Sequence, residues 1–232
     1  MKERPILFNA PMVRSVLSGV KRLTRRVMKP QPPIESCSIF SGRYHPTIID
    51  RHGDEQPGRE TYGAYTEDGE WAVRCPYGQP GDQLWVRETF GDHHRQMLRV
   101  YDTMYRADAD QYGLIGLDEI DDCLLYVEDI RWKPSIHMPR TASRITLEIT
   151  GVRVERVQEI SEADAVAEGV ERVVVGDGWR RYDSSSAIEL AGLVPCETAR
   201  ASYRSLWEQI NGPGSWEANP WVWVIKFKRV TP

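Results

Sequence analysis

The side chains with the clearest chemical potential lie in a short basic run, Gly19-Val-Lys-Arg-Leu-Thr-Arg-Arg26, which holds four cations and one hydroxyl. Residues 1–30 contain eight Lys and Arg and one acid, whereas residues 101–130 contain nine acids and one base. Such asymmetry favours one positive surface for a phosphate-bearing partner. The candidate phosphate contacts are Arg22, Arg25 and Arg26. The alternative is that the two segments pair with each other or face solvent, as charge runs usually do.

Two further pairs of side chains could line a ligand cleft. Trp85 and Arg87 are two residues apart in a strand-like segment, so both side chains point to one face. There an indole could stack on a base while a guanidinium contacts phosphate. His137 and Arg140 lie in a loop bounded by prolines. The alternatives are packing of the first pair beneath an insertion, and a turn with surface polar groups for the second.

We predict neither a metal nor a cofactor. His93 and His94 stand beside Asp92, but adjacent histidines seldom converge on one ion without further ligands. The four cysteines are Cys37, Cys75, Cys123 and Cys196. None lies in a C-x-x-C pair, no histidine spacing completes a zinc pattern, and no glycine-rich phosphate loop is present.

The composition is that of a globular chain, with 41% hydrophobic and 28% charged residues. The net charge of -4 argues against a generally basic nucleic-acid binder. Eight tryptophans could serve base stacking or core packing, and we expect about two thirds of them to be structural. The N-terminus lacks the apolar core of a signal peptide, and no run approaches the ~20 apolar residues of a membrane span. We therefore expect a reduced, cytoplasmic protein.

Short elements must position these groups. The N-terminal half predicts a strand at 5–8, a helix at 11–18 that ends at Gly19, and a strand at 83–90. In the last strand Leu84, Val86 and Glu88 share one face, and Trp85, Arg87 and Thr89 share the other. A further strand is expected around 104–106.

The second half of the chain predicts two strands and two helices. Residues 144–150 alternate, with Ile145, Leu147 and Ile149 toward the core and Thr146, Glu148 and Thr150 away from it. The phase changes at Gly151, which predicts a bulge or sharp bend. Helices are expected at 161–168, capped by Ser161 and stopped by Gly169, and at 198–210. Residues 221–230 predict a closing strand.

Strands and helices interleave irregularly, which favours an α+β fold with a mixed sheet or barrel over a doubly wound parallel fold. The length of 232 residues suits one domain with sizeable insertions or two small domains. We predict a single domain, 1–232, with insertions at about 29–70, 91–130 and 171–196. The first insertion is expected to be extended or a long loop.

Several motifs together resemble the ASCH domain family of the PUA-like superfamily. Gly19-x-Lys21-x-x-Thr24-x-Arg26 follows the first helix, and Gly81-Asp82 precedes a hydrophobic strand. Over nearly its whole length the amino-acid sequence is similar to prophage-encoded proteins. The motifs that carry this similarity are Ala10-Pro-Met-Val-Arg14, Thr24-Arg-Arg26, Gly81-Asp-x-Leu-Trp-Val-Arg-Glu88, Ser135-Ile-His-Met-Pro-Arg140, Ser143-Arg-Ile145 and Gly214-Ser-Trp-Glu-Ala-Asn-Pro-Trp221.

The resemblance implies a small β-barrel with flanking helices and a cleft, and a link to RNA binding. A smaller relative hydrolyses N4-acetylcytidine with a Lys, a Thr three positions later and a Glu on a central strand. These residues fall on Lys21, Thr24 and Glu148, the implied catalytic set. Many family members carry an acid where Thr24 stands, so the threonine brings this chain nearer the amidohydrolase pattern. The three insertions depart from the family pattern, and they could cover or reshape the cleft and so change which substrate it accepts.

Three functions compete at this point. The first is an amidohydrolase acting on a nucleoside or nucleotide, in which a neutral Lys21 amine is the base or nucleophile. Burial and nearby cations would favour the neutral amine, while the end of the preceding helix would oppose it. The second is a non-enzymatic RNA- or DNA-binding module of phage origin. The third is a ribonuclease that needs no metal.

Overall fold

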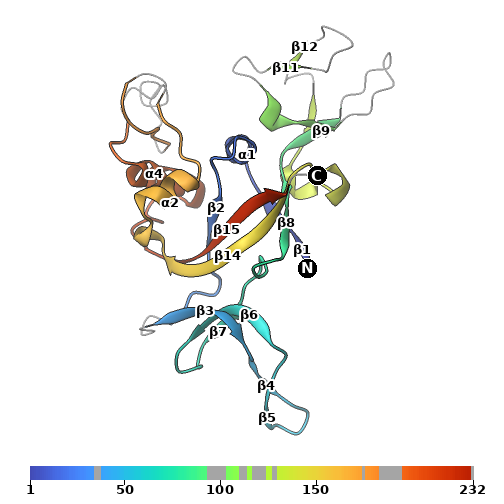
Figure 1. Ribbon diagram of the computed structural model, residues 1–232, viewed down its shortest axis with the longest axis vertical. Helices are drawn as coiled ribbons and strands as arrows, with labels where there is room; N and C mark the ends of the chain where they lie inside the picture. The colour runs from blue at the N-terminus through green and yellow to red at the C-terminus, as the bar shows by residue number, and fades with distance from the viewer. Residues whose placement is uncertain are drawn as a thin grey trace. The chain divides into compact units, whose positions relative to one another are not determined.

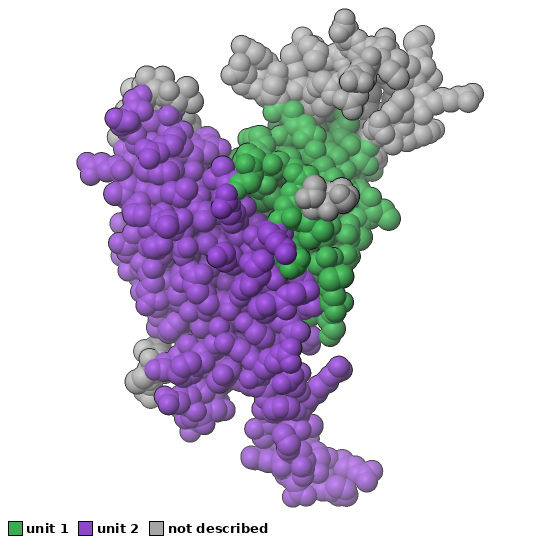
Figure 2. All heavy atoms as spheres, in the orientation of Figure 1, with its two compact units in different colours: residues 1–19, 83–148, 229–232 green, residues 20–82, 149–228 purple. Residues whose placement is uncertain are grey.

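The computed structural model describes residues 1–33, 38–92, 103–109, 114–116, 124–126, 130–173, 176–182 and 195–230. Figure 1 shows a chain made mostly of strands with few helices. It divides into two compact units, coloured separately in Figure 2: residues 1–19, 83–148 and 229–232, and residues 20–82 and 149–228. Each unit is described in turn, and the single domain stays a prediction.

The first unit is built on β1 (Glu3–Leu7) and β8 (Gln83–Arg87), which pair in parallel, with Ile6 opposite Val86. The start of β14 (Thr146–Arg156) pairs with β8 in the antiparallel sense. Leu84, Val86 and Glu88 are buried and the residues between them half-buried. The predicted division of this strand into two faces is therefore confirmed.

Helix α1 (Ala10–Leu17) begins where the side chain of Asn9 accepts a hydrogen bond of 3.0 Å from the backbone N–H of Met12. It ends before Gly19, whose φ of 76° suits glycine. The other strands of this unit are β9 (Phe90–Asp92), β10 (Thr103–Tyr105), β13 (Arg131–Lys133), β11 (Leu114–Gly116) and β12 (Leu124–Tyr126). Three 3-10 turns accompany them: η1 (Arg106–Asp108), η3 (Ser135–His137) and η4 (Arg140–Ala142).

The second unit holds the rest of β14 together with β15 (Trp221–Val230) and β2 (Leu23–Val27). The last two pair antiparallel, with Val224 opposite Arg25. The hydrogen-bonded strand order of this sheet is β1-β8-β14-β15-β2. No strand pairing within the described residues closes it into a barrel, so the α+β class is confirmed and the PUA-like barrel stays a prediction.

Among the described residues of this unit, two helices cover one face of β2 and β15. They are α2 (Glu162–Ala167), which follows η5 (Val157–Glu159), and α4 (Ala199–Asn211). Ser161 caps α2 as the sequence predicts, and Thr198 caps α4; each side chain accepts a hydrogen bond from a backbone N–H at 3.1 Å. Their shared core consists of Leu23, Val157, Ile160, Ala165, Val170, Ala199, Tyr203, Trp207, Trp216, Val222 and Val224.

The segment 29–70, expected to be extended or a long loop, instead forms two small sheets, one of which takes its third strand from just after the segment. Strands β3 (Ile39–Tyr44), β6 (Thr61–Thr66) and β7 (Ala72–Arg74) are antiparallel, and β4 (Thr47–Ile49) pairs with β5 (Glu55–Pro57). The long-loop prediction was wrong because glycines interrupt the alternation that marks a strand. Gly42 and Gly63 face each other across β3 and β6.

Candidate functional site

The first component of the site is a buried ion pair between Lys21 and Glu168. The Lys21 Nζ donates to the Glu168 Oε2 at 2.7 Å and to the Glu168 carbonyl oxygen at 2.8 Å. Lys21 is 2% exposed and Glu168 4% exposed. Glu168 is the C-cap residue of α2, and the next residue, Gly169, has a φ of 91°. A cation at the last carbonyl of a helix is favourably placed, so the fold itself draws this amine to the end of α2.

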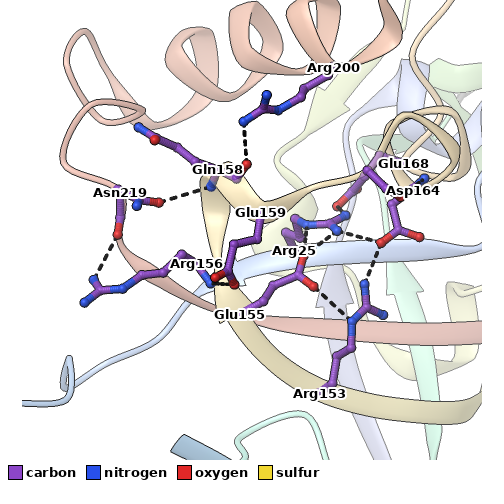
Figure 3. Close-up of polar contacts among 11 residues, drawn as sticks. Arg25, Arg153, Glu155, Arg156, Gln158, Glu159, Asp164, Glu168, Arg200 and Asn219 are labelled. Atoms are coloured by element: carbon purple, nitrogen blue, oxygen red, sulfur yellow. Dashed lines mark hydrogen bonds and ion pairs between the residues drawn. The ribbon is translucent and has the colours of Figure 1, made fainter. Parts of the chain in front are cut away.

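Arg25 forms the second component, on β2. Its Nη2 donates to the Asp164 Oδ2 at 2.9 Å, and its Nη1 to the Glu168 Oε1 at 3.4 Å. Its Nε donates to the Glu155 Oε1 at 2.9 Å. Figure 3 shows these three carboxylates, from β14, α2 and the end of α2, converging on one guanidinium. The arginine is therefore fixed from three directions.

A third cation completes the cluster from the solvent side. Arg153 binds Glu155 at 3.0 Å and Asp164 at 2.5 Å, and its side chain is 43% exposed (Figure 3). Three cations thus meet three carboxylates, and their formal charges cancel. Buried charges are tolerated only when they are paired in this way. We call these six residues the ionic cluster: Lys21, Arg25, Arg153, Glu155, Asp164 and Glu168.

The environment of the cluster alters the acid–base properties of two side chains. Burial lowers the pKa of the Lys21 amine below its ordinary value, and this effect outweighs the opposing attraction of Glu168. Burial raises the pKa of the Tyr203 phenol, which also hydrogen-bonds Glu168, well above its ordinary value. The Arg25 guanidinium lies 5.8 Å from the Tyr203 ring centroid. The tyrosine is therefore a neutral neighbour of the buried pair.

The strand geometry separates Thr24 from this cluster. Leu23 belongs to the core beneath α2 and α4, and Arg25 contacts carboxylates on the same side. Because side chains alternate along a strand, Thr24 points to the opposite face. It is 2% exposed and lies opposite Ile225 of β15. The fold brings Lys21 together with Arg25 rather than directing Lys21 and Thr24 to one point.

The carboxylate on Lys21 is one that the sequence interpretation missed. Glu148 lies on β14, half-buried and paired in register with Gln83, and its part in a catalytic set stays a prediction. The signal available in the sequence was the position of Glu168, directly before the helix-ending Gly169. An acid at the negative end of a helix needs a nearby cation to be stable there.

The basic run does not present all its charges to solvent. Arg22 is exposed and Arg26 half-buried, whereas Arg25 is 4% exposed and bound by three carboxylates. The structure thus gives Arg25 a partner set of its own within the fold. Part of the predicted positive surface is consequently internal, and nucleic-acid contacts by Arg22 and Arg26 stay predictions.

The other predicted contacts lie in the first unit. Arg87 lies 5.3 Å from the centroid of the Trp85 ring and donates to the Met138 carbonyl at 3.2 Å and to the Ile136 carbonyl. His137 is exposed. Arg140 binds Glu3 at 2.9 Å and the Thr146 hydroxyl at 3.2 Å. Arg87 and Arg140 thus bind groups of their own unit, and contacts of all four residues with a ligand stay predictions.

All eight tryptophan side chains are buried or half-buried, and none is fully exposed to solvent. Three are buried, namely Trp207, Trp216 and Trp223, and the other five are half-buried. Four of those five carry an arginine over the ring, at 4.1 to 5.4 Å from the centroid. On the ring face that its arginine covers, a base could stack only by replacing that arginine.

Some predictions fall partly outside the described residues. His93, His94, Cys37 and Cys123 lie there. Across the described ranges, no three His, Cys, Asp or Glu side chains are grouped to hold a metal ion. Cys75 and Cys196 are buried free thiols. None of the helices in the same ranges has the length and apolar sequence that a membrane span requires.

Comparisons of the chain with protein-family models, with curated proteins and with solved structures gave no match. The resemblance to the ASCH family therefore stays a prediction that rests on the motifs in the sequence. The site itself is defined by its geometry, a buried lysine held by an acid at a helix end and flanked by a fixed arginine.

Proposed function

We propose that this protein is an amidohydrolase that acts on N4-acylated cytidine-type nucleosides, with Lys21 as its base and Glu168 as the acid that holds the amine. The observation that carries the proposal is the burial of the Lys21 amine against Glu168 at 2.7 Å. Burial disfavours the charged amine, and a neutral amine can accept a proton at moderate pH. Lysines without such a role are usually exposed.

The chemistry would proceed by general base catalysis. The neutral Lys21 amine takes a proton from water while the oxygen of that water attacks the acyl carbon. The tetrahedral intermediate collapses by breaking the bond from carbon to N4, and N4 receives the proton from the Lys21 ammonium. The products are the nucleoside and a carboxylic acid, which then releases its proton to solvent, and the amine is regenerated. The Thr24 hydroxyl as an additional donor or nucleophile stays a prediction of the family resemblance.

Access is a requirement of this proposal. The Lys21 side chain has 0% relative exposure. A substrate therefore reaches the amine only when neighbouring side chains move aside. A compact, uncharged base with a small acyl group requires the smallest movement of these side chains. Arg25, already bound by three carboxylates, is a poor anchor for a polyanion, which favours a nucleoside over RNA or DNA.

The test is a chromatographic assay of the purified protein with N4-acetylcytidine and a panel of acylated nucleosides and nucleotides. Lys21→Met keeps the volume of the side chain and removes the amine, so turnover should fall by about 10²- to 10⁴-fold. Lys29→Met removes an exposed lysine of the same basic segment and is the matched control.

Two results would count against the proposal. One is retention of turnover by Lys21→Met. The other is no turnover by a folded wild-type protein on any substrate of the panel. The second result would favour the non-enzymatic RNA- or DNA-binding module, and incubation with labelled RNA would separate that module from a ribonuclease.

A further inference from the structure

The carboxylate of Glu168 is divided between two cations. Its Oε2 accepts from Lys21 at 2.7 Å, and its Oε1 lies 3.4 Å from the Arg25 Nη1. Two cations that share one anion repel each other, so each is held less strongly than it would be alone. Lysine can relieve this repulsion by losing its proton, whereas arginine keeps its charge at any ordinary pH.

Arg25 is held in place by contacts other than Glu168. Its Nε binds Glu155 and its Nη2 binds Asp164, both at 2.9 Å, which is shorter than its distance to Glu168. Arg153 braces the same two carboxylates from the outside (Figure 3). The guanidinium has 0% relative exposure and would stay near Glu168 even if that contact weakened. It is a fixed positive charge beside the Lys21–Glu168 pair.

From this geometry we infer that Arg25 is a positioning residue for Lys21: it holds Glu168 and, as a fixed cation, favours the neutral form of the neighbouring amine. The inference rests on the proposed function, in which a neutral amine is the active form. It assigns to Arg25 a role inside the fold in place of the phosphate contact that the sequence suggested.

Three charged groups act on Lys21: Glu168 from the end of α2, and Arg25 and Arg26 from β2. Tyr203 of α4, which is neutral, hydrogen-bonds Glu168. Burial is the largest influence and lowers the pKa of Lys21, Glu168 raises it, and both arginines lower it further. Arg25 therefore acts in the same direction as burial and against Glu168.

The experiment is a pH titration of Lys21 with two independent readouts. The first is the NMR signal of the Lys21 side chain in the whole protein, assigned by its absence in Lys21→Met. The second is the pH profile of kcat/KM on N4-acetylcytidine, whose acidic limb reports the free enzyme's base. Arg25→Gln is compared with wild type and with Arg153→Gln, which removes a cation bound to the same carboxylates but not to Glu168.

The expected result is that Arg25→Gln moves the titration of Lys21 and the acidic limb to higher pH. Turnover near neutral pH should then fall about tenfold, with recovery as the pH is raised. Arg153→Gln should move both readouts less, because its charge is half-exposed and farther along the network. Recovery at high pH distinguishes this role from structural damage, which would lower activity at every pH.

An unchanged titration in Arg25→Gln, or an equal shift in Arg153→Gln, would overturn the inference. If Arg25→Gln does not fold, the double variant Arg25→Gln with Glu155→Gln decides, because it removes one charge of each sign from the ionic cluster. The Lys21 titration should still move upward in that variant, and no movement would refute the role. A shifted NMR titration without any turnover would leave the role of Arg25 intact and defeat the proposed function alone.

Discussion

Asp164 shows how one carboxylate of the cluster serves two arginines. Its Oδ2 accepts from Arg25 at 2.9 Å and from Arg153 at 2.5 Å, while its side chain keeps 25% of its exposure. Burial alone would raise the pKa of Asp164, but the hydrogen bonds and charges of the two arginines outweigh it and hold the pKa below its ordinary value. The ionised form is therefore favoured by folding.

Replacing Asp164 by Asn should lower the free energy of unfolding near neutral pH by about 1–3 kcal/mol, because charged hydrogen bonds are lost. A carboxyl whose pKa is lowered by folding stabilises the protein above its ordinary value of 3.8 and stops doing so as the pH falls through the folded value. The difference between wild type and Asp164→Asn should thus vanish in acid. Urea unfolding at several pH values measures it.

The control for that comparison is Glu217→Gln, which breaks an exposed pair with Arg204 whose side chains are 64% and 50% exposed. Exposed pairs contribute about 0–1 kcal/mol, so its effect should be small at every pH. A difference for Asp164→Asn that persists unchanged in acid would contradict the assigned ionisation.

At the scale of single residues, the sequence indicated Lys21 but not Glu168, the carboxylate that binds its amine. Lys21 stood out because it belongs to a motif and to a basic run. Glu168 lies 147 positions away, and no local pattern links the two residues. Glu148 was chosen instead because alternation made it conspicuous on a strand. Ion-pair partners so far apart in sequence are determined by which helix end packs against which strand. Composition and periodicity do not specify that packing.

Among the elements, the pairing of β3 with β6 depends on a glycine. A Cβ added to Gly63 would come within 2.1 Å of the Val73 carbonyl oxygen, whereas one added to Gly42 would meet nothing closer than 3.6 Å. The second distance is an ordinary contact. The two glycines face each other across the strands, so they form a matched pair for substitution.

Gly63→Ala should therefore open the β6–β7 edge and destabilise the small sheet by about 1–3 kcal/mol, the usual cost of overpacking. Gly42→Ala should be close to neutral. Amide hydrogen exchange of Tyr65 and of its register partner Ala72 reports the change locally. Equal exchange rates in the two variants would show that β6 and β7 do not approach as described.

The elements that the sequence predicted well carry explicit signals. Ser161 and Thr198 mark helix starts, Gly169 and Gly212 mark helix ends, and 221–230 is a long apolar strand. The small sheets within 29–70 lack such signals, because their strands are short and broken by glycine and proline. Their existence depends on pairing between segments, so it was not visible in any single segment.

For the whole molecule, the internal pairing of basic residues sets a limit on nucleic-acid binding. The cations of the basic run and the nearby Lys29 divide into two groups. Arg22, Arg26 and Lys29 are exposed or half-buried, while Lys21 and Arg25 are buried in ion pairs. Each phosphate contact to a single strand contributes about 0.7 to the slope of log K against log salt.

Any binding of a single-stranded oligonucleotide through this run should therefore show a slope of about 2 in magnitude, measured by fluorescence anisotropy across a salt series. Removing Arg22 should lower the slope, whereas Arg25→Gln should leave it unchanged because that charge does not reach solvent. A slope of about 3.5, as expected for all five cations, would mean that the buried cations come out to meet phosphate.

The division of the chain into units has a consequence for how the protein is made. Each unit is assembled from separated stretches, 1–19 with 83–148 and 229–232, and 20–82 with 149–228. A ribosome delivers these stretches in turn, so neither unit can be finished while the other is still to come. Residues of β2 emerge early yet pair with β15, near position 225, so they must wait for most of the chain to be synthesised. During that interval Lys21 and Arg25 have not yet met the carboxylates that later enclose them.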